Sequence, residues 1–146
     1  MASVDYTNGA KAVIPADGIG KYFLLKNRLD FSETPLANAD SAQVFAIKAG
    51  WEIKNVHTKI VTAEGGTASF TIGVTAGASE FEGNGNANAA AGTRTRGIGG
   101  TDAGVTAGGV KYTSDGYLYF DASADLDAAV IDVVAEVVDI DADYSE

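Results

Sequence analysis

Residues 43–74 read QVFAIKAGWEIKNVHTKIVTAEGGTASFTIGV, and this stretch decides the fold. Apolar and polar residues alternate along most of it. Val56 and Ile60 share one face of an extended chain, whereas His57 and Lys59 share the opposite face. Alternation with a period of two, combined with many β-branched residues, is typical of strands that bury one face. The stretch therefore predicts strands with one side against a core and the other side outward.

Two local features divide this stretch. Gly65 and Gly66 predict the tight turn of a hairpin between strands at 51–62 and 67–74, because glycine accepts the positive φ that such turns require. Within the first of these strands, the alternation changes phase near Asn55-Val56. A β-bulge at that point would restore the register and bend the strand.

The rest of the chain adds strands and little helix. Residues 127–140 (DAAVIDVVAEVVDI) are rich in valine and isoleucine, whose β-branching favours a strand over a helix. Residues 21–31 fit two half-strands with a kink at Asn27. Six to eight strands with short turns predict an all-β fold, namely an antiparallel two-sheet sandwich that is jelly-roll-like. The other strands are expected at 40–49 and 116–120.

Two segments are expected to depart from this pattern. Residues 1–20 are small and polar, with turn pairs such as Asn8-Gly9, and predict a flexible or draped N-terminal arm ahead of a single domain at 21–146. Residues 83–110 hold nine of the chain's 18 glycines and show no hydrophobic period. Such a long excursion either orders against a neighbouring subunit or stays a flexible surface loop, and composition alone leaves both open.

Two sets of residues are candidates for contact with another subunit. The outward face of the closing strand is only half polar, since valines alternate there with Asp132 and Glu136; the N-terminal arm or another subunit could cover it. The larger side chains of the glycine-rich excursion form the second set. The candidates are Val130, Val134 and Val138 in the strand and Arg94, Arg96 and Ile98 in the excursion.

Charge is unevenly distributed along the chain. Residues 1–111 carry ten basic and ten acidic side chains, whereas residues 112–146 carry ten acids and no base, which accounts for the net charge of −10. A phosphate backbone repels such a segment, so nucleic acid is not an expected partner. The acids serve solubility or meet a basic partner surface. There is no cysteine, no signal peptide and no apolar run of ~18 residues, so neither disulfides nor a membrane partner is expected.

Chemistry-bearing motifs are few, and no catalytic, cofactor-binding or metal site is predicted. His57 is the only histidine, which excludes sites with two or three histidine ligands, and its place in mid-strand favours a solvated cross-strand residue over a catalytic base. Two groups of aspartates could instead hold calcium or simply stabilise turns, and this choice stays open. These groups are Asp121, Asp125 and Asp127, and Asp139, Asp141 and Asp143.

Aromatic residues offer one further candidate site. Trp51 follows a glycine corner and could stack on a sugar ring, although a lone tryptophan in that position is more often packed in a core or an interface. Tyr112, Tyr117 and Tyr119 are open to the same two interpretations, and packing is favoured for them as well.

Short motifs give the chain a resemblance to a known family. The corner Ile47-Lys48-Ala49-Gly50, the turn Glu64-Gly65-Gly66-Thr67, the strand end Ile72-Gly73 and a closing strand rich in Val and Ile follow one another in this order. This order resembles a large, loosely similar set of structural proteins of tailed bacteriophages. The resemblance covers about residues 29–140. Lys48 stands where the family usually has proline.

The resemblance implies a small jelly-roll protein on the virion, most commonly a decoration (cement) protein bound outside the capsid. Its implied partners are the major capsid protein and further copies of itself, often as a trimer, and its implied location is the outer capsid surface. The six candidate contact residues would then serve an oligomer or capsid interface. The alternative is a sandwich module of a head or tail fibre that binds a host glycan through Trp51. Neither hypothesis is enzymatic.

Overall fold

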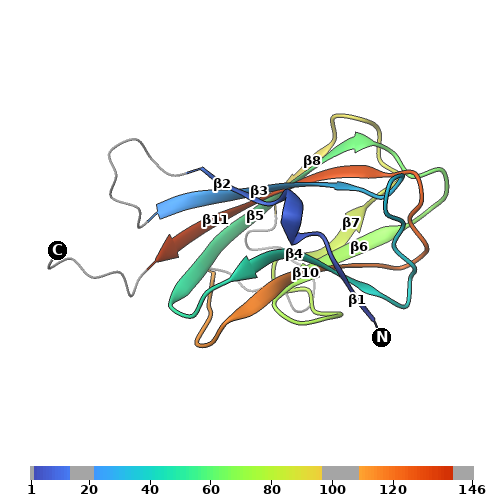
Figure 1. The fold of residues 1–146 in the computed structure, drawn as a ribbon. Helices are drawn as coiled ribbons and strands as arrows, with labels where there is room; N and C mark the ends of the chain where they lie inside the picture. The colour runs from blue at the N-terminus through green and yellow to red at the C-terminus, as the bar shows by residue number, and fades with distance from the viewer. Residues whose placement is uncertain (1, 14–21, 97–108, 140–146) are drawn as a thin grey trace, which may run out of the picture.

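The computed structural model describes residues 2–13, 22–96 and 109–139, which form two packed β-sheets (Figure 1). The layers lie one above the other, with β3, β11 and β5 in one and β4, β10 and β6 in the other. Among the described residues there is no helix long and apolar enough to cross a membrane. The elements are β1 (Ser3–Asp5), the 3-10 helix η1 (Thr7–Gly9), β2 (Lys11–Val13), β3 (Tyr22–Asp30), β4 (Ser41–Ile47), β5 (Trp51–Thr62), β6 (Ser69–Gly73), β7 (Glu82–Asn86), β8 (Arg94–Arg96), β9 (Val110–Lys111), β10 (Gly116–Ala122) and β11 (Val130–Asp139).

The strand order identifies a jelly roll. One sheet has the order β1-β4-β10-β6-β7, and the other has the order β2-β3-β11-β5-β8 with β9 also paired to β5. The antiparallel pairs β3–β11, β4–β10, β5–β8 and β6–β7 are nested. The chain therefore folds back on itself as one long hairpin, which rolls up into two sheets. This confirms the predicted sandwich and its jelly-roll character.

The connection between β5 and β6 differs from the prediction. A hairpin was expected at Gly65-Gly66, but β5 and β6 belong to different sheets, so the loop between them crosses the sandwich. Neither glycine has a positive φ. Instead, the buried Glu64 carboxylate holds the loop, because its Oε2 accepts hydrogen bonds from the backbone N–H groups of 127–129 at 3.0 to 3.2 Å.

Strand β3 runs straight through the position where a kink was expected. Its pairing with β11 is continuous from Tyr22 to Asp30. The side chain of Asn27 points into the core, where its Nδ2 donates to the carbonyl oxygens of Tyr6 at 3.0 Å and Val44 at 2.9 Å. Asn27 thus joins the sheets across the core and does not break the strand.

The bulge predicted in β5 is confirmed. Asn55 lies opposite Glu136 and Ile53 lies opposite Val137, so Lys54 is the extra residue. This insertion changes the phase of the strand and places Ile53 and Val56 on the same inner face, where both are buried.

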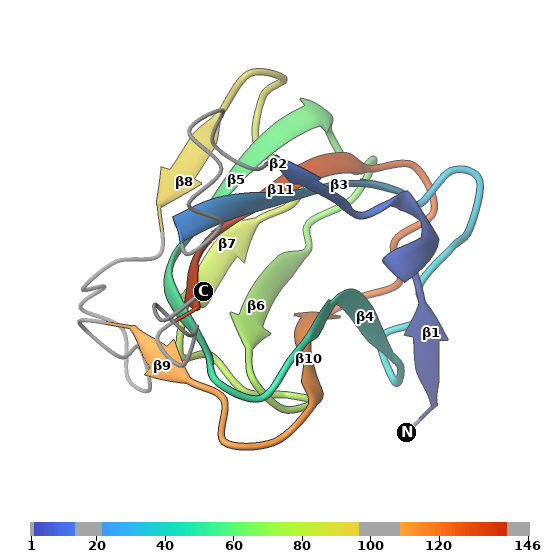
Figure 2. The same cartoon turned by 60° about the vertical axis from the view of Figure 1, so that its left-hand side comes forward.

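The N-terminal arm is more structured than predicted. Strand β1 pairs in parallel with β4, and β2 pairs antiparallel with β3, so residues 2–13 contribute one strand to each sheet (Figure 2). Between them, the ring of Tyr6 meets Phe31 edge to face at 5.7 Å, and its hydroxyl donates to the carbonyl of Thr34 at 2.6 Å. Residues 2–13 therefore close one side of the sandwich, and the pairs that they form are with β4 and β3 and not with β11. Residues 14–20 lie outside the described residues.

The glycine-rich excursion also belongs to the sandwich over its first half. β7 pairs with β6 and β8 pairs with β5, while residues 97–108 lie outside the described residues. The small residues have a packing reason: a Cβ on Gly85 would lie 2.2 Å from the ring of Phe70. Residues 83–96 are thus ordered by this chain's own strands, whereas the prediction offered only a neighbouring subunit or a flexible loop.

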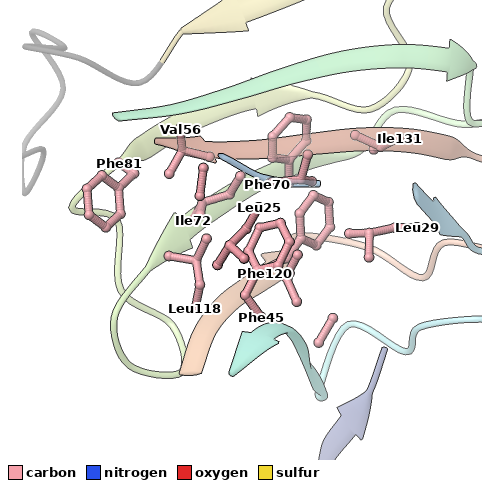
Figure 3. Packing of buried hydrophobic residues seen from close by; sticks show 14 of the residues in the cluster. Leu25, Leu29, Phe45, Val56, Phe70, Ile72, Phe81, Leu118, Phe120 and Ile131 are labelled. Carbon is pink, nitrogen blue, oxygen red and sulfur yellow. The ribbon is translucent and has the colours of Figure 1, made fainter. Parts of the chain in front are cut away.

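A single hydrophobic core fills the space between the sheets (Figure 3). Phe70 and Phe120 stack with ring centroids 4.8 Å apart, and Phe31 lies 5.5 Å from Phe120. Ile131 and Leu29 face this cluster from β11 and β3 and are fully buried. Because the core takes every second residue of β3, β5 and β11, the alternate residues of those strands form one outward surface.

Candidate interaction face

The outward surface of the six-stranded sheet, called here the outer face, is centred on β11. Its neighbours β3 and β5 run antiparallel to it on either side. Along β11 the inward residues are buried, and the outward residues are half-buried. Those outward residues are Val130, Asp132, Val134, Glu136 and Val138.

The first polar contact on this face is a two-point ion pair. Arg28 on β3 lies opposite Asp132. Its Nε donates to Oδ1 at 2.6 Å, and its Nη2 donates to Oδ2 at 2.9 Å. The hydrogen bond from Arg28 lowers the pKa of Asp132, and the positive charges of Lys59 and Lys26 lower it further. Asp132 is therefore a carboxylate surrounded by more positive charge than it neutralises.

The second contact is a network around Glu136. Its Oε2 lies 2.9 Å from His57 Nε2 and accepts from Asn55 Nδ2 at 2.8 Å, while its Oε1 accepts from the Tyr22 hydroxyl at 2.7 Å. The hydrogen bond to His57 is the largest cause of a lowered pKa at Glu136, followed by that from Tyr22. His57 is on the outward side as predicted, and it has an acidic partner there.

Between these contacts lies an open depression of about 370 Å³. Val134, Thr58 and Thr95 contribute to its lining, and the basic side chains of Lys26, Lys59 and Arg94 also line it, together with His57 and Asp132. Lys26 and His57 flank Val134 from the two neighbouring strands, and Lys59 is paired with Arg94 across β5 and β8. Since Asp132 is held by Arg28, the depression carries an excess of positive charge.

The two sheets differ sharply in charge. Eight of the ten lysines and arginines lie in strands of the six-stranded sheet, namely β2, β3, β5, β8 and β9, and they outnumber the five acids in the strands of that sheet, Asp30, Glu52, Asp132, Glu136 and Asp139. The strands of the five-stranded sheet contain no lysine or arginine but carry Asp5, Glu82 and Asp121. A strongly acidic chain thus has one cationic face, which the distribution of charge along the sequence does not reveal.

The structure brings some of the predicted contact residues together. Arg94 and Val134 line the same depression. Val130 and Val138 lie on the same face near the two ends of β11, and the backbone of Arg96 pairs with His57. Ile98 lies outside the described residues.

Trp51 is engaged in packing. Its ring meets Phe23 edge to face at 4.9 Å, and the Lys48 ammonium lies 5.8 Å from its ring centroid. Tyr112 is buried and donates to the carbonyl oxygen of Tyr117, and burial raises its pKa. The ring centroids of Tyr117 and Tyr119 lie 6.1 Å apart on the five-stranded sheet.

Asp121 and Asp125, two of the aspartates considered for calcium, accept hydrogen bonds from different parts of the chain. Asp121 accepts from Ser41 Oγ and from the N–H of Gly77, whereas Asp125 accepts from the N–H of Asn38. Within residues 2–13, 22–96 and 109–139 there is no group of three His, Cys, Asp or Glu side chains placed to hold a metal ion. Asp139 is the last described residue of the second group, and Asp141 and Asp143 lie beyond it.

Sequence reasoning missed Lys26 and Lys59 as members of this face. The signal was present, because both occupy polar positions in the alternation of their strands. What was missing was the pairing of β3, β11 and β5, which places residues distant in sequence on one surface. Alternation assigns a residue to a face of its own strand but not to a neighbouring strand.

No protein family model matches the chain, and no curated protein matches it either. Three solved phage structures contain a chain of similar fold. In the capsid of Ralstonia phage GP4 the TM-score is 0.63 at 11% identity, covering 94% of this chain and 97% of that one. In the cyanophage Pam1 capsid asymmetric unit the TM-score is 0.59 at 12% identity, covering 90% of this chain and 95% of that one. In the acidic stable capsid of Helicobacter pylori bacteriophage KHP30 the TM-score is 0.54 at 16% identity, covering 88% of this chain and 90% of that one. At such identities the likeness establishes that these chains share the jelly-roll fold.

Proposed function

We propose that this protein is a structural component of a tailed-bacteriophage virion, which binds the outside of the capsid and stabilises it as a decoration protein. The observation that carries the proposal is the fold shared with chains in three phage capsids over nearly the full length of both chains. The matched chains are therefore about as small as this one. The order of motifs along the sequence supports the same assignment.

The physical logic of a decoration protein suits this chain. A stable sandwich needs no disulfide, and the chain contains no cysteine. Weak contacts repeated over a lattice reinforce one another, because each bound copy raises the effective concentration of its other contacts. We propose that Arg94, Val130, Val134 and Val138 contribute to such an interface, and that Arg96 and Ile98 do so from the neighbouring segment.

We also propose that the protein acts as a homo-oligomer and take a trimer as the expected state, on the basis of the family resemblance. Sedimentation equilibrium of the purified protein tests this directly. A monomer at the concentrations used for capsid binding would contradict it.

The glycan-binding alternative has less support. It relied on Trp51, whose ring is already engaged by Phe23 and Lys48. A change in tryptophan fluorescence on addition of host polysaccharide would favour it over decoration.

The decisive experiment adds purified protein to capsids that lack it. The protein is expected to sediment with the particles up to a saturating number of copies and to raise the temperature at which they release DNA. Protein that stays in the supernatant and leaves this temperature unchanged would contradict the proposal. Bovine serum albumin at equal concentration is the control for non-specific protection.

A further inference from the structure

From the charge and shape of the outer face, we infer that its cationic depression binds carboxylate side chains of an acidic capsid surface, so that the six-stranded sheet faces the shell and the five-stranded sheet faces outward. This inference rests on the proposed function and adds to it the docking face, the chemistry of the partner and the orientation of the bound molecule.

The first step is the charge of the depression. Lys26, Lys59 and Arg94 line it, and Arg28 holds Asp132, the one carboxylate among the described residues that line it, through two hydrogen bonds. An incoming carboxylate therefore meets three cations and a neutralised acid. Hydrogen bonds between charged partners are shorter and stronger than neutral ones, and guanidinium groups bind carboxylates through two N–H donors.

The second step is the apolar surface around these cations. Val134 lies in the depression, and Val130 and Val138 continue the same row of β11 in both directions. All three are half-buried, which leaves apolar area to be covered by a partner. An interface with apolar contacts beside charge pairs gains both burial and orientation.

The third step weighs against a second copy as the occupant. The acids of β7 and β10 belong to the sheet on the opposite side of the sandwich. A contact between opposite faces of successive copies forms a ring only if its rotation closes, and otherwise gives open filaments. A contact between two outer faces would bring like charges together. If the shell presents acids, each copy binds it through the outer face, and the copies form a single layer in one orientation.

Nucleic acid is also a poor occupant. The chain carries a net charge of −10, so a phosphate backbone is repelled at long range even though the depression attracts single anions. Carboxylates on a protein surface can bind the depression through short-range charge pairs alone, because the partner is not a continuous polyanion.

The test measures binding to capsids that lack the protein, using the double variant Lys59→Glu with Arg94→Glu. The control for position is Ala46→Glu, which adds one carboxylate at an exposed position of β4 on the five-stranded sheet; it changes the net charge by −1, whereas the double variant changes it by −4. We expect the double variant to bind about tenfold more weakly or worse, as for the loss of paired interface charges. The control is expected to bind like the unmodified protein.

A milder variant guards against misfolding. Lys59→Gln with Arg94→Gln removes the charges only, and circular dichroism checks that both double variants are folded. The affinity of the unmodified protein should fall as NaCl is raised, and this dependence should be weaker in the Gln variant.

The outcomes separate the two proposals. If the unmodified protein binds and both folded double variants bind equally well, the docking inference is wrong while the decoration function stands. If the unmodified protein does not bind at all, the proposed function fails and the inference fails with it. Release of self-association by Lys59→Glu with Arg94→Glu, or binding of duplex DNA to the outer face, would assign the face to a different occupant and overturn the inference.

Discussion

At the scale of single residues, Glu64 explains how the chain crosses between its sheets. Its side chain is 6% exposed, yet it carries a carboxylate. Burial alone would raise its pKa, but hydrogen bonds from the backbone N–H groups of Ala129, Ala128, Gly65 and Asp127 outweigh burial and lower it. A buried charge is tolerable only when it is fully hydrogen-bonded, and these donors meet that need.

Replacing Glu64 by Gln is therefore expected to destabilise the protein. The amide offers one acceptor oxygen in place of two and directs an NH₂ group at backbone donors. The cost should be about 1–3 kcal/mol, measured by urea unfolding. The exposed Glu33→Gln is the control and should change the free energy of unfolding little. Equal stabilities for the two variants would contradict the role given to the Glu64 carboxylate.

The same carboxylate predicts a dependence on pH. Because the pKa of Glu64 is lowered from its ordinary value of 4.5 in the folded protein, its contribution is fully present above that value. The contribution is lost as the pH falls through the folded pKa, since the unfolded chain binds the proton first. Stability of the unmodified protein should therefore fall below about pH 4.5 more steeply than stability of Glu64→Gln.

We predict opposite effects on stability for replacing Gly85 and Gly65 by alanine. Gly85→Ala would place a Cβ 2.2 Å from the buried ring of Phe70, and we expect it to destabilise by about 1–3 kcal/mol. Gly65→Ala meets no atom within 4 Å and has no positive φ to strain, so it should be neutral or slightly stabilising. Thermal unfolding of both variants decides. A large loss of stability in Gly65→Ala would mean that this position needs a glycine, as the predicted tight turn would require.

At the scale of elements, alternation located strands more reliably than it paired them. The strand at 51–62 has the predicted bounds, and its bulge lies one residue from the predicted phase change. The partner of each strand was not predictable, because alternation reports which face is buried and carries no information about the neighbouring strand. The crossing loop shows why: Glu64 binds the N–H of Asp127, 63 residues later in the chain.

The cationic face could not be predicted from the sequence for the same reason. Arg94, Val130, Val134 and Val138 were singled out from single segments, but Lys26 and Lys59 join them only through pairing in the folded sheet. Strands β1 and β2 were not predicted, because strands of three residues carry too little pattern to be recognised.

The arm should contribute to stability if β1 and β2 belong to the sheets. Deleting residues 2–13 removes both strands and the contacts of Tyr6 with Phe31 and Thr34. We expect the free energy of unfolding to drop by about 2 kcal/mol or more, from lost burial and hydrogen bonds. Tyr6→Ala should reproduce part of this loss. A deletion variant that unfolds at the same urea concentration as the full chain would show that the arm is a mere appendage.

At the scale of the whole molecule, the two sheets differ in charge, so the two faces of the sandwich are not equivalent. Cations gather in the strands of one sheet and are absent from the strands of the other. Net charge governs solubility, whereas the arrangement of charge governs orientation at a partner surface. An acidic protein can therefore dock through a cationic face while its other side remains negatively charged.

Because the chain has no cysteine, single cysteines can report this orientation without a background reaction. Val134→Cys labels the outer face without removing a cation, and Ala46→Cys labels the five-stranded sheet. In free protein, both thiols should react with a maleimide. Once the protein is bound to capsids, Val134→Cys is expected to be protected at least about tenfold, because docking removes it from solvent, while Ala46→Cys keeps its rate. Protection of Ala46→Cys with a fully reactive Val134→Cys would reverse the orientation, and it would mean that charge on the outer face does not direct docking.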